Sequence, residues 1–379
     1  MNRRELLKVL GLASAGLVLD PFNSLNKIHA KGIEKKLKHW AWLSIDTDFT
    51  IDEWKKKFER IRAAGIDAII PEVTSSRVAL YGSKHLPVKD KLLEKILPLA
   101  KDSGLEVHTW MWTMVCNNEE ILKNHPEWYI VNARGESCLQ HPPYAAWYKF
   151  LCPSREGPQD YITKTVDELA SYELVDGVHL DYIRYPEVII SESLRPKYGI
   201  IQDKEYPEYD YCYCEVCRAK FKEQTGITLS DLKDPSINME WKQFRYDSIT
   251  NLVNGKLIPA AKKYNKQVTA AVFPPWNQHN VRQQWSNWNL DSVHLMNYNS
   301  FYWQGHEWIK NQNEIGIESL KKPMELYSGL FIPDLFPNGL KKAVEASLTG
   351  GANGIALFSA HSMTEEHWKA FEDTIRNYK

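Results

Sequence analysis

The sequence has no surplus of charge of either sign. Its 379 residues include 47 lysines and arginines and 48 aspartates and glutamates, which leaves a net charge of −1. A chain this close to neutrality has no strong field to attract nucleic acid or anionic lipid, so we expect no nucleic-acid partner. The His-x-His and His-Glu-x-x-His patterns of catalytic metal sites are also absent from the sequence. Their absence argues against an enzyme that uses a histidine-bound metal for hydrolysis.

The N-terminal region has no hydrophobic run long enough to span a bilayer. The run over residues 9–19 follows a pair of arginines at residues 3–4, whereas a membrane-spanning helix needs about 20 apolar residues. This layout is typical of an export signal and looks like the twin-arginine type. We therefore expect an export signal over residues 1–30, a catalytic domain over residues 31–379, a periplasmic or extracellular location and no stable membrane anchor. A short amphipathic helix is the alternative.

The rest of the chain alternates short apolar runs with amphipathic stretches. The predicted strands cover His39–Asp46, Ile66–Val73, Leu105–Met114, Val175–Tyr182, Gln267–Phe273, Asp291–Tyr298, Met324–Leu330 and Gly354–Ala360. Helical patterns between them include Ile51–Ala64, Lys91–Ser103, Gln159–Tyr172 and Leu340–Leu348, and a long helix is expected near Ile237–Tyr264. Eight strand–helix units without a glycine-rich phosphate loop predict an α/β fold, a single (β/α)8 TIM barrel.

Two connections are much longer than the others. Cys116–Pro158 follows the third predicted strand, and Pro186–Asp247 follows the fourth. Long connections inside a compact domain usually carry function or small subdomains. In a barrel they extend the C-terminal face, where active sites lie. We therefore expect the long loops after strands three and four to border the site.

Period-two alternation predicts which side chains point into the barrel. In the fourth strand, His179 and Asp181 would point inward, whereas Tyr182 would face the helices. Inward-pointing His108 and His294 would join His179 in a buried polar layer below the site. Polar and aromatic side chains should therefore gather at the C-terminal ends of several strands.

Aromatic residues are abundant, with 14 tryptophans, 19 tyrosines and 12 phenylalanines. Most of the tryptophans fall at the C-terminal ends of predicted strands or in the loops beyond. Indole faces suit the apolar faces of sugar rings, and the indole N–H can still pair with a hydroxyl. The predicted substrate-binding residues are Trp42, Trp110, Trp112, Arg184, Tyr185, Trp276, Asn297, Tyr298 and His361. The alternative is that the tryptophans only cover a loop-rich surface.

Three carboxylates end predicted strands on the inward register. Asp181 ends the run Val-Asp-Gly-Val-His-Leu-Asp, and a carboxylate there is costly unless it is paired or used. Glu72 and Asp46 end the second and first strands. Glycoside hydrolysis needs two carboxylic groups that flank the bond, so we predict Asp181 with Glu72 as the first pair and Asp181 with Asp46 as the second. The alternatives are a structural ion pair of Asp181 with Arg184 and a helix-capping role for Asp46.

Six cysteines occur, and three of them lie within six residues. Cys212, Cys214 and Cys217 form the motif Cys-Tyr-Cys-Glu-Val-Cys. Three thiols so close together suit tetrahedral thiolate coordination better than disulfides, and Cys152 is available as a fourth ligand. Because soft thiolates favour zinc, we predict a structural zinc that joins the two long loops. Disulfides within the cluster are the alternative.

The fourth strand also carries a family resemblance. Asp-Gly-Val-His-Leu-Asp-Tyr-Ile-Arg-Tyr-Pro, at residues 176–186, resembles the strand-four signature of glycosyl hydrolase-like family 10, and the resemblance covers most of the barrel from about residue 38. It implies a (β/α)8 fold with sugar chemistry. The motifs His-Pro-Glu (residues 125–127) and Leu-Cys-Pro-Ser (residues 151–154), together with the three-cysteine motif, resemble family 42 β-galactosidases. In those enzymes the matching cysteines bind a structural zinc.

The resemblance stops at the acid/base residue. Family 42 enzymes carry a glutamate just after the strand-four aspartate, and family 18 chitinases have one in a similar strand, whereas this chain has Ile183 there. Neither mechanism therefore transfers to this chain. The sequence predicts an exported glycoside hydrolase acting on an oligo- or polysaccharide, in which Asp181 is the nucleophile or base and Glu72 or Asp46 the acid. A catalytically inactive carbohydrate-binding barrel is the alternative.

Overall fold

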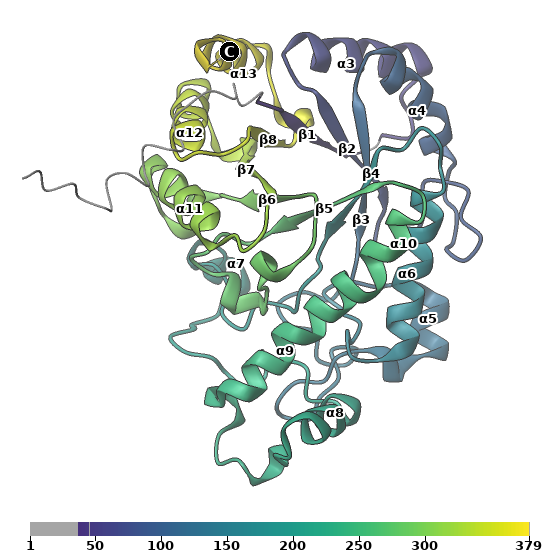
Figure 1. Ribbon diagram of the computed structural model, residues 1–379, viewed down its shortest axis with the longest axis vertical. Helices are drawn as coiled ribbons and strands as arrows, with labels where there is room; N and C mark the ends of the chain where they lie inside the picture. Colours follow the sequence, from purple (N-terminus) through teal and green to yellow (C-terminus); the bar gives the residue numbers. More distant parts are fainter. Residues whose placement is uncertain (1–36, 45, 379) are drawn as a thin grey trace, which may run out of the picture. The chain divides into compact units, whose positions relative to one another are not determined.

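The computed structural model describes residues 37–44 and 46–378. Eight parallel strands follow one another in chain order around a closed barrel, and β8 pairs with β1 (Figure 1). The strands are β1 Trp40–Leu43, β2 Ala68–Thr74, β3 Glu106–Trp112, β4 Gly177–Asp181, β5 Gln267–Val272, β6 Ser292–Met296, β7 Glu325–Phe331 and β8 Ile355–Phe358. The predicted (β/α)8 fold is confirmed.

Helices follow the strands around the outside of the barrel. They are α3 Ile51–Ala63, α4 Leu92–Asp102, α5 Glu119–Asn124, α6 Glu156–Ala170, α7 Arg195–Tyr198, α8 Glu215–Thr225, α9 Met239–Leu252, α10 Ile258–Lys262, α11 His306–Ser319, α12 Pro337–Thr349 and α13 Glu365–Ile375. A π-helical turn over Val253–Leu257 joins α9 to α10. The predicted long helix near 237–264 is thus one nearly continuous rod, which Figure 1 shows running from the region of α8 to the side of the barrel.

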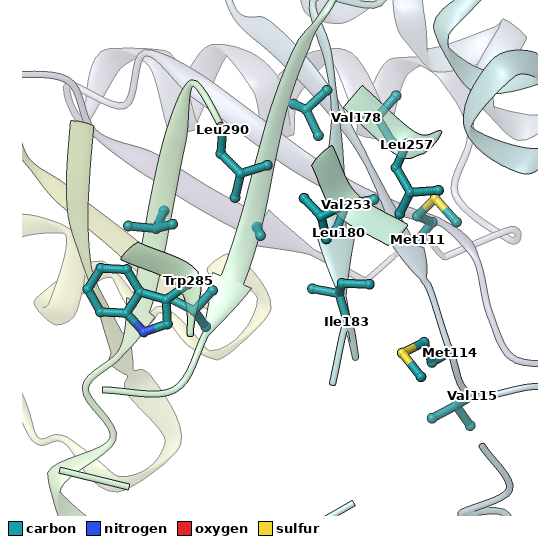
Figure 2. Close-up of a cluster of buried hydrophobic side chains, with 14 of the residues drawn as sticks. Met111, Met114, Val115, Val178, Leu180, Ile183, Val253, Leu257, Trp285 and Leu290 are labelled. Carbon is teal, nitrogen blue, oxygen red and sulfur yellow. The ribbon is translucent and has the colours of Figure 1, made fainter. Parts of the chain in front are cut away.

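Apolar side chains form two separate layers. The outer layer lies between the barrel and its helices, and Figure 2 shows Val178 and Leu180 of β4 there beside Leu257. The inner layer fills the barrel with the side chains of Trp40, Trp42, Ala68, Ile70, Trp110, Ala271, Tyr327 and Ala356. The two layers confirm the predicted alternation within the strands, because neighbours along a strand belong to different layers.

One prediction of side-chain direction is wrong. Tyr182 was expected to face the helices, but β4 ends at Asp181 and Tyr182 has φ +51°, so the chain leaves the strand geometry there. The Tyr182 ring consequently lines a cavity at the barrel mouth. Ile183 takes the outward position instead and is fully buried in the outer layer near Met114 (Figure 2).

The two long loops are held to each other and to α9. Asp210, in the loop after β4, forms ion pairs with Arg245 of α9 and Arg282 of the loop after β5, and all three side chains are buried. Asn132, in the loop after β3, forms an antiparallel bridge with Tyr211. These contacts fix the walls of the barrel mouth. None of the helices within the described residues has the length and apolar character needed to cross a membrane.

Candidate active site

A cavity of about 460 Å³ opens at the C-terminal ends of the strands. Strand ends supply Trp42, Glu72, Trp110, Trp112, Asp181, Ala271, Met296, Phe331 and Phe358 to its walls. The loops supply Ser44, Tyr144, Ala145, Trp147, Tyr148, Tyr182, Arg184, Glu187, Ile190, Ser191, Leu194, Tyr198, Phe273, Tyr298, Phe301 and Tyr302. An apolar, aromatic cavity with a few convergent polar groups is the usual form of a small-molecule site.

Asp181 and Glu72 both lie in this cavity, on either side of β3. The β-sheet register sets Glu72 beside Trp110 and Asp181 beside Trp112. Two bonds orient the Asp181 carboxylate: its Oδ2 accepts from the Trp110 indole N–H at 3.1 Å, and its Oδ1 accepts from the Tyr182 backbone N–H at 2.7 Å. Both members of the first predicted carboxylate pair therefore line the same cavity.

The surroundings of the two carboxyl groups favour a proton on Glu72. Burial, together with the nearby charge of Asp181, raises the pKa of Glu72 to about 7. Burial also raises the pKa of Asp181, but its hydrogen bond from the Tyr182 N–H and the positive charge of Arg184 oppose that shift. Two carboxyl groups with unequal stabilisation of their charged forms are suited to separate acid and base roles.

Arg184 pairs with a different carboxylate. Its guanidinium lies 3.3 Å from Glu187, and the Glu187 carboxylate also accepts a hydrogen bond of 2.5 Å from the hydroxyl of Tyr148. Among the described residues, Arg184 thus forms its ion pair with Glu187. The structural Asp181–Arg184 pair that the sequence suggested as an alternative is not formed. Because its partner is nearby and buried, Arg184 is a fixed part of the cavity wall.

The ring of Tyr182 connects Arg184 to the tryptophans. The Arg184 guanidinium lies 4.9 Å from the Tyr182 ring centre, and Trp112 lies 4.7 Å away on a tilted geometry. Trp147 contacts both Trp112 and Tyr182. A bulky residue with positive φ is strained, and such strain persists only where the surrounding structure enforces it. Here it turns the ring of Tyr182, the residue that follows Asp181, toward the cavity.

A histidine layer forms the floor. His108, His179 and His294 are fully buried, as predicted. Trp42 donates its indole N–H to Nε2 of His179 at 3.2 Å, so Nδ1 of His179 carries the proton and donates to the Thr269 hydroxyl at 2.8 Å. Burial lowers the pKa of His179 well below its usual value, which keeps the ring neutral. The floor therefore orients Trp42 of the cavity.

Five residues predicted for the site lie outside the lining of this cavity. Asp46 accepts a hydrogen bond from the Asp48 N–H, and Thr50 rather than Asp46 caps α3. Trp276 is 55% exposed on the loop after β5, and His361 is exposed after β8.

The other two point away from the barrel lumen. Asn297 is buried behind β6, where it donates to Asn313 of α11 and Ser328 of β7. Tyr185 is buried against the thiols of the cysteine cluster, with which it interacts electrostatically. Neither side chain is placed where it could touch a ligand in the cavity.

Several lining residues were not predicted from the sequence. Tyr144, Tyr148, Glu187 and Tyr198 come from the two long loops, where no periodicity indicates side-chain direction. Glu187 could have been noticed, because it follows Arg184 at a spacing that allows an ion pair. The tryptophan signal was also partly misleading: Trp285 and Trp288 are fully buried in the outer layer and serve packing.

Four cysteines form a compact buried cluster. The sulfur atoms of Cys152, Cys212, Cys214 and Cys217 all lie within 4.8 Å of one another. Cys152 lies 3.5 Å from Cys217 and 3.8 Å from Cys214 and Cys212. These distances exceed the length of a disulfide, about 2.05 Å, and match the edge of a tetrahedron of thiolates around zinc, about 3.8 Å for bonds of about 2.3 Å. The cluster is therefore compatible with a metal site.

Comparison with known proteins identifies the family. The model of the family described as Glycosyl hydrolase-like 10 matches residues 39–317, which is well over half of the chain. The chain belongs to the glycosyl hydrolase-like 10 family. This membership confirms the predicted family and the predicted class of enzyme, a glycoside hydrolase. No curated protein matches the chain.

Solved structures with the same fold are also glycoside hydrolases by name. The glycoside hydrolase domain of PgaB (BpsB) from Bordetella bronchiseptica aligns at a TM-score of 0.70 and 11% identity, over 89% of this chain and 98% of that one. The catalytic domain of β-amylase from Paenibacillus polymyxa gives 0.63 and 13%, over 92% and 100%. A β-galactosidase from Rahnella sp. R3 gives 0.65 and 13%, over 91% and 56%. At these identities the likeness supports the fold of the glycosyl hydrolase-like chain.

Proposed function

We propose that this protein hydrolyses a glycosidic bond of an oligo- or polysaccharide in the aromatic cavity, with Asp181 and Glu72 as the catalytic pair. What supports the proposal is that two half-buried carboxyl groups line the same cavity, and that burial and the charge of Asp181 raise the pKa of one of them, Glu72, to about 7. Asp46, the second candidate acid, lies outside the cavity lining, which favours Glu72.

The two carboxyl groups take separate roles. Glu72, protonated, donates its proton to the glycosidic oxygen as the bond to the leaving group breaks. Asp181, ionised and held by the Trp110 and Tyr182 N–H groups, attacks the anomeric carbon or removes a proton from the attacking water. Trp42, Trp110, Trp112 and Tyr298 offer ring faces to the sugar.

Kinetics with substituted carboxyl groups tests the proposal. A screen of polysaccharides and of aryl glycosides with poor leaving groups should find activity in the wild type, and losses of about 100-fold or more in both Asp181→Asn and Glu72→Gln. Both substitutions keep the size of the side chain, so circular dichroism should show an unchanged fold. Equal turnover by all three proteins would remove the proposed roles.

A catalytically inactive carbohydrate-binding barrel is the alternative function. It uses the same aromatic cavity but needs no proton on Glu72. Sugar binding without hydrolysis in the wild type, unchanged in Asp181→Asn, would favour this alternative.

We also propose that the cysteine cluster holds a structural zinc. Four thiolates would complete a closed tetrahedral shell, which leaves no position for substrate. Cys152 lies on the loop after β3 and the other three ligands on the loop after β4 and the start of α8, so the ion would join the two loops that wall the cavity.

Export completes the proposal. The predicted signal over residues 1–30 lies outside the described residues, so it stays a prediction. A twin-arginine route moves proteins that are already folded, which would let the cysteine cluster acquire its metal before export to the periplasm or the exterior. Detection of mature protein in the periplasm, lost on Arg3→Lys with Arg4→Lys, tests it.

A further inference from the structure

The three most exposed of the described large aromatic residues lie on neighbouring loops at the C-terminal ends of the strands. Trp276 is 55% exposed, Trp303 70% and Phe336 85%. They lie on the loops after β5, β6 and β7, the three consecutive loops at the C-terminal end of this part of the barrel. Large exposed apolar rings on adjacent loops are costly in water and mark an interaction site when they cluster. We define these three residues as the aromatic rim.

Each of the three loops has the same arrangement. A ring that lines the cavity precedes each exposed ring: Phe273 precedes Trp276, Tyr302 precedes Trp303, and Phe331 at the end of β7 precedes Phe336. Rings of the rim and rings of the cavity lining are therefore close neighbours along the same segments of chain.

Hydrogen bonds hold the three loops together. The Asn277 side chain donates to the Tyr302 hydroxyl at 2.6 Å, which joins the loops after β5 and β6 next to Trp276 and Trp303. The Ser300 hydroxyl donates to Asp334 at 2.7 Å, which joins the loops after β6 and β7. A rim whose loops are fixed in this way presents its rings with little loss of entropy on binding.

The backbone at Trp303 gives an independent indication. Trp303 has φ +51° and ψ +37°, the left-handed region that glycine adopts at least cost. Folding alone would favour glycine or asparagine here. A tryptophan in this strained conformation that is 70% exposed is better explained by a ligand than by packing.

The charges of the cavity limit the ligand. Asp181, Glu187 and Glu72 line it, and Arg184 is the one cation among the described lining residues, already paired with Glu187. An acidic sugar would thus face the Asp181 carboxylate without a free partner. A ligand that fits the cavity and the rim therefore carries no acidic groups.

We propose that the aromatic rim binds an extended, uncharged polysaccharide whose next sugars occupy the cavity. The inference rests on the proposed glycoside hydrolysis and specifies its substrate: a polymer that reaches beyond the cavity, rather than a disaccharide that the cavity alone would hold. Flat pyranose faces would stack on Trp276, Trp303 and Phe336.

The test separates the rim from the catalytic pair. Affinity electrophoresis compares three proteins: the wild type, a triple variant that combines Trp276→Ala, Trp303→Ala and Phe336→Ala, and the control Ile237→Ala. The gels contain neutral glucan, galactan or mannan, or polygalacturonate as the acidic polymer. Ile237 is 70% exposed like Trp303 but precedes α9, away from the strand ends. All four side chains are on the surface, so the variants should fold.

We expect a neutral polymer to retard the wild type and Ile237→Ala. In the triple variant the affinity for this polymer should be weaker, by roughly two- to tenfold for each ring removed. Cleavage of that polymer should fall in parallel, while kcat/KM for an aryl glycoside, which occupies only the cavity, stays unchanged. If the triple variant binds and cleaves the neutral polymer like the wild type, the rim is not a binding site, even if the protein is a hydrolase. The same conclusion follows if the wild type binds no neutral polymer or prefers polygalacturonate. Rim-dependent binding without any hydrolysis would remove the proposed function and leave the rim intact.

Discussion

At the scale of single residues, the proton on Glu72 is the feature most open to experiment. Burial and the charge of Asp181 hold its pKa at about 7, far above that of an exposed glutamate. As the acid, Glu72 must be protonated to act. We therefore expect kcat/KM to be highest below pH 7 and to fall by about tenfold for each pH unit above it. The pH profile of the wild type on an aryl glycoside with a poor leaving group measures this limb.

A leaving group that needs no protonation supplies the control. With a strongly acidic phenol as leaving group, Glu72→Gln should retain most of the wild-type rate and lose the alkaline limb. In Asp181→Asn the neighbouring charge is gone, so the pKa of Glu72 should drop, which an NMR titration of the glutamate carboxyl carbons can follow. An alkaline limb near pH 7 that persists in Glu72→Gln would assign the proton to another group.

Side-chain direction was predictable inside the strands and not beyond their ends. Asp181 and His179 follow the period of two because ladder hydrogen bonds fix each residue of β4. Tyr182 has no such constraint, and its positive φ reverses the expected direction. At the end of β6, both Asn297 and Tyr298 were predicted to bind substrate. The structure has Tyr298 in the cavity and Asn297 in a polar network with α11.

At the scale of elements, the buried ion cluster around Asp210 holds the loop after β4 in place. Its carboxylate is shared by Arg245 and Arg282 and accepts a hydrogen bond from Tyr213, and it is only 2% exposed. Removing one member of a buried cluster leaves uncompensated charge. Asp210→Asn should therefore lower the free energy of unfolding by about 3–5 kcal/mol, measured by urea denaturation.

An exposed ion pair provides the matched control for this prediction. Asp160 lies 3.4 Å from Lys256 with about half of each side chain exposed, so Asp160→Asn should cost less than about 1 kcal/mol. If both substitutions had the same small effect, the cluster around Asp210 would contribute no more than a surface pair. The loop that carries Arg184 and Glu187 would then need another anchor.

At the scale of the whole molecule, the barrel could be predicted and the cavity wall only in part. Each strand–helix unit repeats one pattern, so an error in one unit does not change the closed order of eight strands. The wall contributed by the long loops depends on tertiary contacts, such as the bond from the Tyr148 hydroxyl to Glu187 and the bridge of Asn132 with Tyr211. No local pattern in the sequence encodes these contacts.

The cysteine cluster joins these loops, and metal removal should therefore affect the entire barrel mouth. We expect about one zinc per purified chain, and well under half that amount in Cys214→Ser. The buried thiol of Cys138, outside the cluster, gives the control Cys138→Ala, which should keep its zinc. Removal of zinc by a chelator should lower Tm of wild type and Cys138→Ala by several degrees and leave Cys214→Ser unchanged, because free energy of metal binding is also free energy of folding.

Limited proteolysis locates that loss of stability. The loop after β3 carries Cys152, and the loop after β4 carries Cys212 and Cys214. If the metal joins them, chelation should expose both loops to cleavage at the same time and leave the strands of the barrel resistant. Metal-free wild-type protein with full thermal stability and protected loops would show that the four thiols pack as a reduced cluster. The walls of the cavity would then depend on the ion cluster and the aromatic contacts alone.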